Sequence, residues 1–431
     1  MGELDLEKQK QVNIISLKVF YLFSFFAVGS LTPLLSVYLA NEAGLSGIEI
    51  GTIMSVGPIV MIVFQPLWGI VCDWSGRPAK ILAMTSLLAG VFGLGYLLFD
   101  HYLLIVSVAV ALAIFQSAII PVSDSITLQY TTKIKSNYGK IRLFGSLGYG
   151  VAVFVMGKLS ESFMGPSVIF YAFFFGLLIA ASLALRLPEE PPGEKVKLFG
   201  GMKELITMKR FLIFLAITFL LFGPNLANNV YYGLFVEARG GTYTGIGIAF
   251  LLAVLSEIPF MRIAGTWIHK IGLLPITLLA GTASLVRWVL YFTEPSLATV
   301  YVSSIIQGFS LGLFIPAALQ YIREVVPVRI TVTAITLYSA IGNGLGNWFS
   351  TFSGGIILDK SGIYAVYLFY GLLTLIGMLL TIWLMWYEKK IKSYGETHRY
   401  NRKMMEIKAR DLFAYHGEEV FLYSIYKFER T

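Results

Sequence analysis

Residues 102–120 read YLLIVSVAVALAIFQSAII, a run in which no side chain carries a charge. About 20 apolar residues in a helix are needed to cross the hydrocarbon core of a bilayer. Comparable runs, separated by short polar breaks, recur from Phe20 to Trp386. They predict an all-α membrane protein with twelve transmembrane helices. The expected spans are 17–40, 49–72, 81–99, 103–131, 141–160, 166–186, 210–236, 245–268, 273–293, 297–324, 330–357 and 363–388.

The composition agrees with burial in lipid. The 431 residues are 56% hydrophobic and 13% charged, with a mean hydropathy of +0.74, whereas a soluble domain has roughly a quarter of its residues charged. The first sixteen residues are polar, and no small-residue cleavage site follows the first apolar run. That run is therefore predicted to be a membrane span and not a signal peptide.

Catalytic and metal chemistry are not expected. Cys72 is the only cysteine, which excludes an internal disulfide and a thiolate cluster. The four histidines fall in predicted loops or in the tail, so no histidine-based catalytic or metal constellation is visible. We therefore expect neither an enzyme nor a resident cofactor.

The basic residues behind the net charge of +8 are distributed as in a membrane protein. The charge therefore does not indicate a nucleic-acid partner. Counted by predicted loop, 17 Lys and Arg residues lie on one side, against Lys158, Arg239 and Lys360 on the other. The positive-inside rule then places both termini and the central loop in the cytoplasm of a cell-membrane protein. The tail at 389–431 is also basic; a solvated tail is favoured over an amphipathic helix lying on anionic headgroups.

A polar break divides the chain into two similar halves. The segment PEEPPGEKVKLFGGMKEL (188–205) is rich in Pro, Gly and charge. It predicts an N-terminal six-helix bundle (1–187), a central loop (188–208), a C-terminal six-helix bundle (209–388) and the tail. IRLFGSLGYG (141–150) aligns with ITLYSAIGNG (335–344), and GIVCDWSG (69–76) aligns with GTWIHKIG (265–272). Pseudo-symmetric bundles of this kind are typical of transporters with a site between the halves.

The loop GIVCDWSGRPAKI (69–81) resembles the signature loop of the major facilitator superfamily. A charged turn that obeys the positive-inside rule would explain its basic residues, but not the spacing of its glycines and aspartate. The resemblance implies a conformational latch, with Gly69 allowing close helix approach. The residues concerned are Gly69, Asp73, Gly76, Arg77 and Lys80.

Two opposite charges lie at matching depth in the fourth and fifth spans. A charge inside a span costs at least about 2.5 kcal/mol on insertion scales, so it needs a partner or a wet cavity. Asp124 and Arg142 are each nine residues from Lys133 along antiparallel helices, roughly 13 Å from the turn. The pair could bind the carboxylate or hydroxyls of a solute. The alternative is a buried structural ion pair.

The stretch SDSITLQYTTKIKSNYGKIRLFGSLGYG (123–150) is similar to the lactose permease and phenylpropionate permease branch of the superfamily. The shared features are an acid in the fourth span and the run Tyr138, Gly139, Lys140, Arg142, Gly145 and Ser146. The resemblance implies that Asp124 and Arg142 belong to the substrate site.

Glu257 and Arg287 are the corresponding charges of the second half. They are 13 and 17 residues from the turn near Lys270, so their depths differ by only about 6 Å. A buried carboxylate is the simplest proton carrier, and the branch carries an acid and an Arg at similar places. The resemblance implies proton coupling by Glu257 and Arg287, with Asp124 as a second candidate. A purely structural pair is the alternative.

The sequence also departs from this branch. Where lactose permease has charged residues in its tenth span, IIQGFSLGLFIP (305–316) offers Gly308, Leu311 and Phe314. Asn225 replaces an acid of the seventh span. The predicted lining is therefore polar but uncharged. It comprises Asn225, Asn228, Asn229 and Gln307, with Tyr149, Tyr231, Tyr232, Trp288 and Trp348 as aromatic candidates for stacking on a solute.

These features favour a monomeric proton-coupled symporter that moves a small organic solute across the bilayer by alternating access. A sugar, a nucleoside and an aromatic acid all fit Arg142. The alternatives are an exporter of drugs or metabolites driven by proton antiport, a non-transporting receptor and, least favoured, a membrane enzyme.

Overall fold

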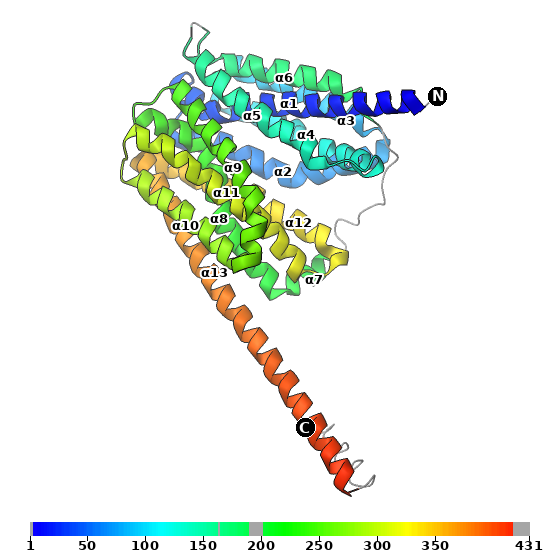
Figure 1. Ribbon diagram of the computed structural model, residues 1–431. Helices are drawn as coiled ribbons and strands as arrows, with labels where there is room; N and C mark the ends of the chain where they lie inside the picture. Colours follow the sequence, from blue (N-terminus) through cyan, green and yellow to red (C-terminus); the bar gives the residue numbers. More distant parts are fainter. Residues whose placement is uncertain (1–2, 163, 189–200, 417–431) are drawn as a thin grey trace. The chain divides into compact units, whose positions relative to one another are not determined.

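The computed structural model describes residues 3–162, 164–188 and 201–416. Met1–Leu380 form one compact unit and Thr381–Thr431 a second. All elements in the described ranges are helical (Figure 1). The first half contains α1 (Glu3–Asn41), α2 (Gly47–Ser75), α3 (Pro78–Leu94), η1 (Gly95–Leu97), α4 (Tyr102–Lys133), α5 (Tyr138–Ser160) and α6 (Val168–Ala184). The second contains α7 (Met202–Thr207), α8 (Lys209–Ala238), α9 (Tyr243–Ile271), α10 (Leu273–Phe292), α11 (Leu297–Val325), η2 (Val328–Ile330), α12 (Thr331–Ser339), the π-helix η3 (Ala340–Gly346) and α13 (Asn347–His416).

Twelve spans follow from these helices, as the sequence predicts. In the described ranges, ten helical stretches are long and apolar enough to cross a membrane, and α6 is a shorter apolar helix of 17 residues. The last stretch, Val328–Ile391, is interrupted at Gly362, whose φ of 81° is not helical. It therefore supplies two spans.

The helix ends carry local signals. At the start of α2, the Ser46 and Glu49 side chains each accept a hydrogen bond from the other residue's backbone N–H, which forms a capping box. The Asn137 side chain accepts from the Lys140 N–H at 3.3 Å and starts α5. Gly76 ends α2 with a φ of 63°, in the left-handed region that glycine adopts without strain.

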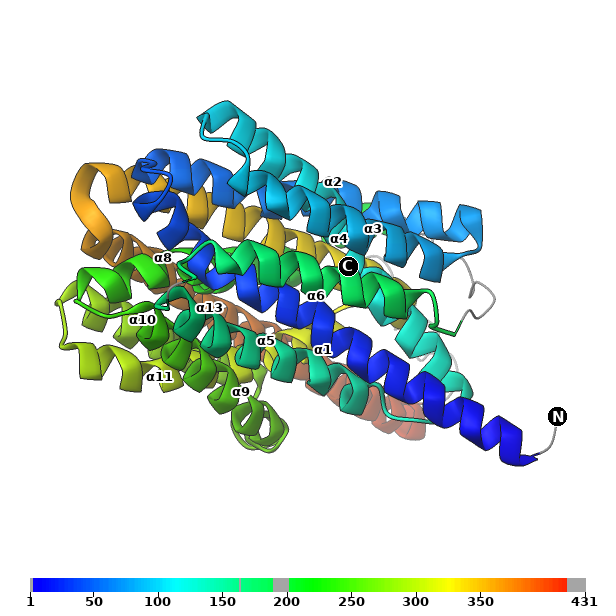
Figure 2. The same cartoon turned by 90° about the horizontal axis from the view of Figure 1, so that it is seen from above.

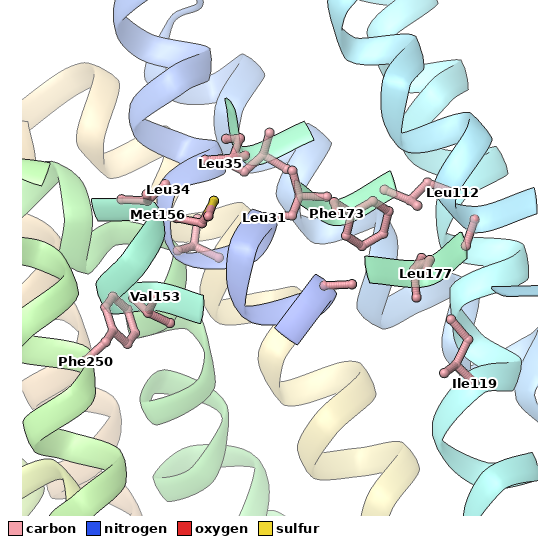
Figure 3. Close-up of a cluster of buried hydrophobic side chains, with 14 of the residues drawn as sticks. Leu31, Leu34, Leu35, Leu112, Ile119, Val153, Met156, Phe173, Leu177 and Phe250 are labelled. Carbon is pink, nitrogen blue, oxygen red and sulfur yellow. The ribbon is translucent and has the colours of Figure 1, made fainter. Parts of the chain in front are cut away.

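Apolar side chains fill the interior of the first half (Figure 3). Leu31 and Leu35 of α1, Phe173 of α6 and Leu112 of α4 belong to one buried cluster. Phe250 of α9 is part of the same cluster, so apolar packing crosses from one half to the other. Figure 2 shows the same helices from above.

The internal repeat has a direct structural counterpart. A Cβ at Gly148 would collide with the α1 backbone, and a Cβ at its equivalent Gly342 would press on α8, which occupies the place of α1 in the second half. Gly150 faces α9 across the halves, and its equivalent Gly344 faces α2. The repeated glycines therefore mark the same two contacts twice.

The closest backbone contacts between the halves gather at one end of the bundle. We call the end where α1 begins the terminus end, and the end with the α1–α2 loop (42–46) the far end. At the far end, a Cβ on Gly51 of α2 would lie 2.6 Å from the Cα of Gly355 of α13. A Cβ on Gly247 of α9 would lie 2.7 Å from the carbonyl oxygen of Val153 of α5. Such backbone contact is available only to small residues.

Two carboxylates add polar contacts at the far end. Glu161, which follows α5, accepts hydrogen bonds from the backbone N–H and hydroxyl of Thr244 in α9, at 2.8 and 2.6 Å. Asn41 at the end of α1 donates to Glu237 at the end of α8, at 2.5 Å. The far end is thus closed by both packing and hydrogen bonds.

The division into bundles at 1–187 and 209–388 stays a prediction. Residues 189–200 of the central loop and 417–431 of the tail lie outside the described residues. Within the described ranges, α1–α6 and α8–α12 lie on opposite sides of the view in Figure 1.

Candidate functional site

The fourth and fifth spans bring their two charges together. The Arg142 Nε lies 3.6 Å from the Asp124 Oδ1, with the side chains 28% and 27% exposed. The short turn between α4 and α5 places both residues at the same depth, as the residue count predicts. The pair is therefore neither sealed in the core nor fully solvated.

Two aromatic residues of α1, Tyr21 and Phe25, complete this pair, although the sequence pattern does not indicate them. The Tyr21 hydroxyl donates to the Asp124 Oδ1 at 2.6 Å. The Phe25 ring lies 4.1 Å from the Arg142 guanidinium carbon, which is a cation–π distance. Nothing in the local sequence distinguishes Tyr21 from the other aromatic residues of α1. Its role is shown only by the position of α1 beside both Asp124 of α4 and Arg142 of α5.

A cavity of about 270 Å³, which we call the charged cavity, lies between the halves. It is bordered by α1, α5, α8, α9 and α11. Its polar lining consists of Arg142, Ser146, Tyr149, Asn229, Glu257 and Gln307. The predicted residues Arg142, Tyr149, Asn229, Glu257 and Gln307 thus share one cavity, whereas Asp124 reaches it through Arg142.

Arg287 is fully buried and is held by amides. Its guanidinium donates to the Gln307 Oε1 at 2.7 Å and to the Asn225 Oδ1 at 3.1 Å. The guanidinium carbon also lies 4.3 Å from the ring of Trp288. In the described part of the chain, Arg287 has no carboxylate partner. The expected approach of Glu257 and Arg287 is therefore not formed in this conformation.

The absence of a side chain at Gly308 in the tenth span has a steric cause. Gly308 of α11 lies so close to α9 that an added Cβ would meet the backbone nitrogen of Glu257 at 2.6 Å. At Gly312 an added Cβ would lie 2.9 Å from the Glu257 carbonyl oxygen. These glycines let α11 pack tightly on α9 beside Glu257, so no side chain fits between the two helices.

The remaining amides play two roles. Gln307 donates to Asn229 at 3.3 Å and accepts from Asn228 at 3.3 Å, which links the buried Arg287 to the cavity surface. Asn225 donates to Ser284 at 3.0 Å. Asn225 and Asn228 are 3% and 0% exposed and support the lining without forming it.

Most of the aromatic candidates do not reach the charged cavity. Tyr231, Tyr232 and Trp288 are buried to within 2%. Tyr232 and Trp288 pack inside the second half, and the Tyr231 hydroxyl lies beside Gly51 of α2. Trp348 stacks on Phe352, with ring centroids 6.1 Å apart. Of the five predicted residues, only Tyr149 lines the cavity. High aromatic content alone does not separate packing residues from lining residues.

The α2–α3 loop is not engaged in this conformation. Asp73, Arg77 and Lys80 are exposed and form no ion pair in the ranges described. Contrary to expectation, Gly69 makes no close helix contact: a Cβ there would meet nothing within 4 Å. Gly69 instead lines a cavity of about 360 Å³ that is bordered by α2, α12, η3 and Pro121 of α4.

Comparison with known proteins identifies the family. The model of the MFS_1 like family matches residues 14–369. The chain belongs to this family. The resemblance to the major facilitator superfamily is thereby confirmed, and the chain is a multi-pass membrane transporter of a small-molecule solute.

Two sequence relatives and one solved structure show what the chain is similar to. The chain is 51% identical over 381 residues to the uncharacterized transporter YwbF of Bacillus subtilis (strain 168), covering 88% of this chain and 96% of that protein. It is 48% identical over 379 residues to a maltose permease of Geobacillus stearothermophilus, covering 88% and 95%. A crystal structure of the nucleoside transporter NupG matches with a TM-score of 0.76 at 16% identity, over 86% of this chain and 98% of that one. This last likeness concerns the fold alone.

Proposed function

We propose that this transporter is a proton-coupled symporter that imports maltose or a closely related sugar across the cell membrane. The observation that carries the proposal is the Asp124–Arg142 pair at the border of the charged cavity, 3.6 Å apart and partly exposed. The 48% identity to a maltose permease favours a sugar over the nucleoside and aromatic acid that Arg142 would also fit.

The lining suits hydroxyl groups. Arg142 and Asn229 offer N–H donors, Tyr149 and Ser146 offer hydroxyls, and Glu257 offers an acceptor. Charge-assisted hydrogen bonds to Arg142 are about twice as strong as neutral ones. A sugar entering the cavity would replace water on these groups while keeping their hydrogen bonds satisfied.

Glu257 is the proposed proton carrier. It is the one carboxylate among the described residues that line the charged cavity. Arg142, which lines the same cavity, pairs with Asp124 instead. Protonation would discharge the loaded carrier before it reorients. One charge moved across 100 mV supplies about 2.3 kcal/mol, enough for uphill uptake of a neutral sugar.

Rocking of the two halves would expose the cavity alternately. In the described conformation the halves meet closely at the far end, through the glycine contacts and Glu161. With 17 basic residues on the side of the termini, we assign the terminus end to the cytoplasm and this conformation to the inward-facing state.

The test separates binding from coupling in proteoliposomes. Uphill maltose uptake driven by an imposed proton gradient is compared with maltose counterflow, which needs no gradient, for wild type and Glu257→Gln. Glu294→Gln is the matched control, because Glu294 pairs with Arg239 at the far end, away from the cavity.

We expect Glu257→Gln to abolish uphill uptake and to retain counterflow, while Glu294→Gln retains both. Uphill uptake that persists in Glu257→Gln would remove the coupling role of this residue. A wild type that shows no maltose counterflow would contradict the proposed solute.

A further inference from the structure

A second cavity adjoins the charged cavity. It has a volume of about 300 Å³ and lies between α1, α2, α4, α8 and the start of α13. Its walls are mainly apolar, with Leu31, Leu35 and Met54 among the lining residues; Figure 3 shows Leu31 and Leu35 within the buried cluster. We call it the apolar lobe.

Asn229 connects the two cavities. This residue of α8 lines both the charged cavity and the apolar lobe. Its side-chain carbonyl oxygen accepts from Gln307, whereas its side-chain amide donates to nothing in the described ranges. The two cavities have similar volumes, about 270 and 300 Å³. The charged cavity alone is just below, and the apolar lobe alone at the lower end of, the roughly 300–1,000 Å³ that is usual for ligand pockets.

The apolar lobe also presents polar groups without partners. Gln116 of α4 and Thr32 of α1 make no side-chain hydrogen bond to the described part of the protein. Asn347 accepts from Thr351 at 3.1 Å, which leaves its amide N–H groups available. A lipid chain would leave all these groups unsatisfied, and that is costly in an apolar surrounding.

We propose that the apolar lobe is a second sugar subsite, which takes one pyranose ring of a disaccharide while the charged cavity takes the other. A pyranose ring has apolar C–H faces and a rim of hydroxyls, which matches apolar walls with a few unpaired amides. This inference rests on the proposed function and specifies it: Gln116, Asn229 and Asn347 would select for the length of the solute.

A glycine offers a clean way to fill the lobe. Gly57 of α2 lines it, and a Cβ there would meet nothing within 4 Å. The Cβ of Gly57→Leu therefore has room at the wall of the lobe, and the rest of the side chain would reduce the volume of the lobe. Gly265→Leu is the matched control, because Gly265 also lies in a helix with nothing within 4 Å but lines neither cavity. Gln116→Ala removes a rim contact without adding volume.

The experiment measures inhibition constants of glucose and maltose against labelled maltose counterflow in proteoliposomes. We expect wild type and Gly265→Leu to bind maltose at least about tenfold more tightly than glucose. In Gly57→Leu this preference should disappear while glucose affinity is unchanged, and Gln116→Ala should reduce it severalfold.

Three outcomes would overturn the proposed subsite, and each has a different consequence for the proposed function. Equal affinities for glucose and maltose in wild type would show that no second ring is bound. An unchanged preference in both Gly57→Leu and Gln116→Ala would place the second ring elsewhere, with the proposed function intact. A wild type that binds neither sugar would refute the proposed function and this inference together.

Discussion

Glu161 of the first half caps the first turn of α9 in the second half, accepting from the Thr244 N–H at 2.8 Å and from its hydroxyl at 2.6 Å. The positive end of a helix dipole favours a carboxylate at this place. Because the contact joins the two halves, it stabilises the conformation in which the far end is closed.

Removing this contact should open the far end. In a Cys72→Ser background, a cysteine at Val37, which is 1% exposed at the far end, reports access to a membrane-impermeant maleimide. We expect Glu161→Ala to speed its labelling severalfold. Glu294→Ala breaks an ion pair within one half and should have no effect; equal rates in both variants would show that Glu161 does not hold the halves together.

The same contact should not respond to pH in the neutral range. Burial raises the pKa of Glu161, but hydrogen bonds from Thr242 and Thr244 outweigh this effect and lower the pKa below its ordinary value. Its stabilisation is then fully present above the ordinary glutamate pKa and is lost only as the pH falls through the lowered one. Val37→Cys labelling should therefore be constant between about pH 6 and 8, after correction for maleimide reactivity.

The glycine contact between α2 and α13 should be equally important for closure of the far end. A Cβ at Gly355 would lie 2.7 Å from the Cα of Gly51 and from the carbonyl oxygen of Gly47, and backbone cannot move aside easily. We expect Gly355→Ala to prevent far-end closure and to slow counterflow. Gly371→Ala, whose Cβ would have its nearest neighbour at 3.7 Å, should behave as wild type; similar behaviour of the two variants would argue against the contact.

Tyr21 should contribute to solute affinity through Asp124. Its hydroxyl donates to the Asp124 carboxylate at 2.6 Å, and a hydrogen bond to a charged group is worth about 1.5–3 kcal/mol. Tyr21→Phe should weaken maltose binding about tenfold or more. The control is Tyr367→Phe, because the buried Tyr367 hydroxyl has no partner in the described ranges; equal affinities in the two variants would exclude Tyr21.

Arg287 should matter both for stability and for the orientation of the cavity lining. Removing the guanidinium takes a donor from the buried side-chain oxygens of Gln307 and Asn225. Because an unsatisfied buried acceptor costs about 1–3 kcal/mol, Arg287→Met should lower the melting temperature moderately. Arg287→Ala, which leaves a void, should cost about 2–5 kcal/mol. Both should impair maltose counterflow, because Gln307 and Asn225 lose the donor that orients them. Full counterflow in a stable Arg287→Met would contradict this role.

Spacing along antiparallel spans is enough to predict that Asp124 and Arg142 meet, because helix rise converts residue count into depth. The twelve spans follow from apolar run length for the same reason. Counting residues does not show how a helix is rotated about its axis. The sequence therefore does not show that Tyr21 joins the pair, that Asn225 and Asn228 face away from the cavity, or that Arg287 points to amides instead of Glu257.

The sequence likewise does not show which conformation the transporter adopts. The signature loop predicts a close helix contact for Gly69, but this residue faces a cavity because the halves are joined at the far end. A transporter needs each contact in only one of its states, so a motif predicts that a contact can form and not when it forms.

Solute binding by the Asp124–Arg142 pair is tested most directly by maltose counterflow in proteoliposomes of wild type, Asp124→Asn and Arg142→Ala. Lys158→Ala, at the exposed end of α5, is the control, and melting temperatures verify that each variant is folded. We expect counterflow in wild type and Lys158→Ala and its loss in both site variants. Wild-type counterflow in Arg142→Ala would contradict the proposed site.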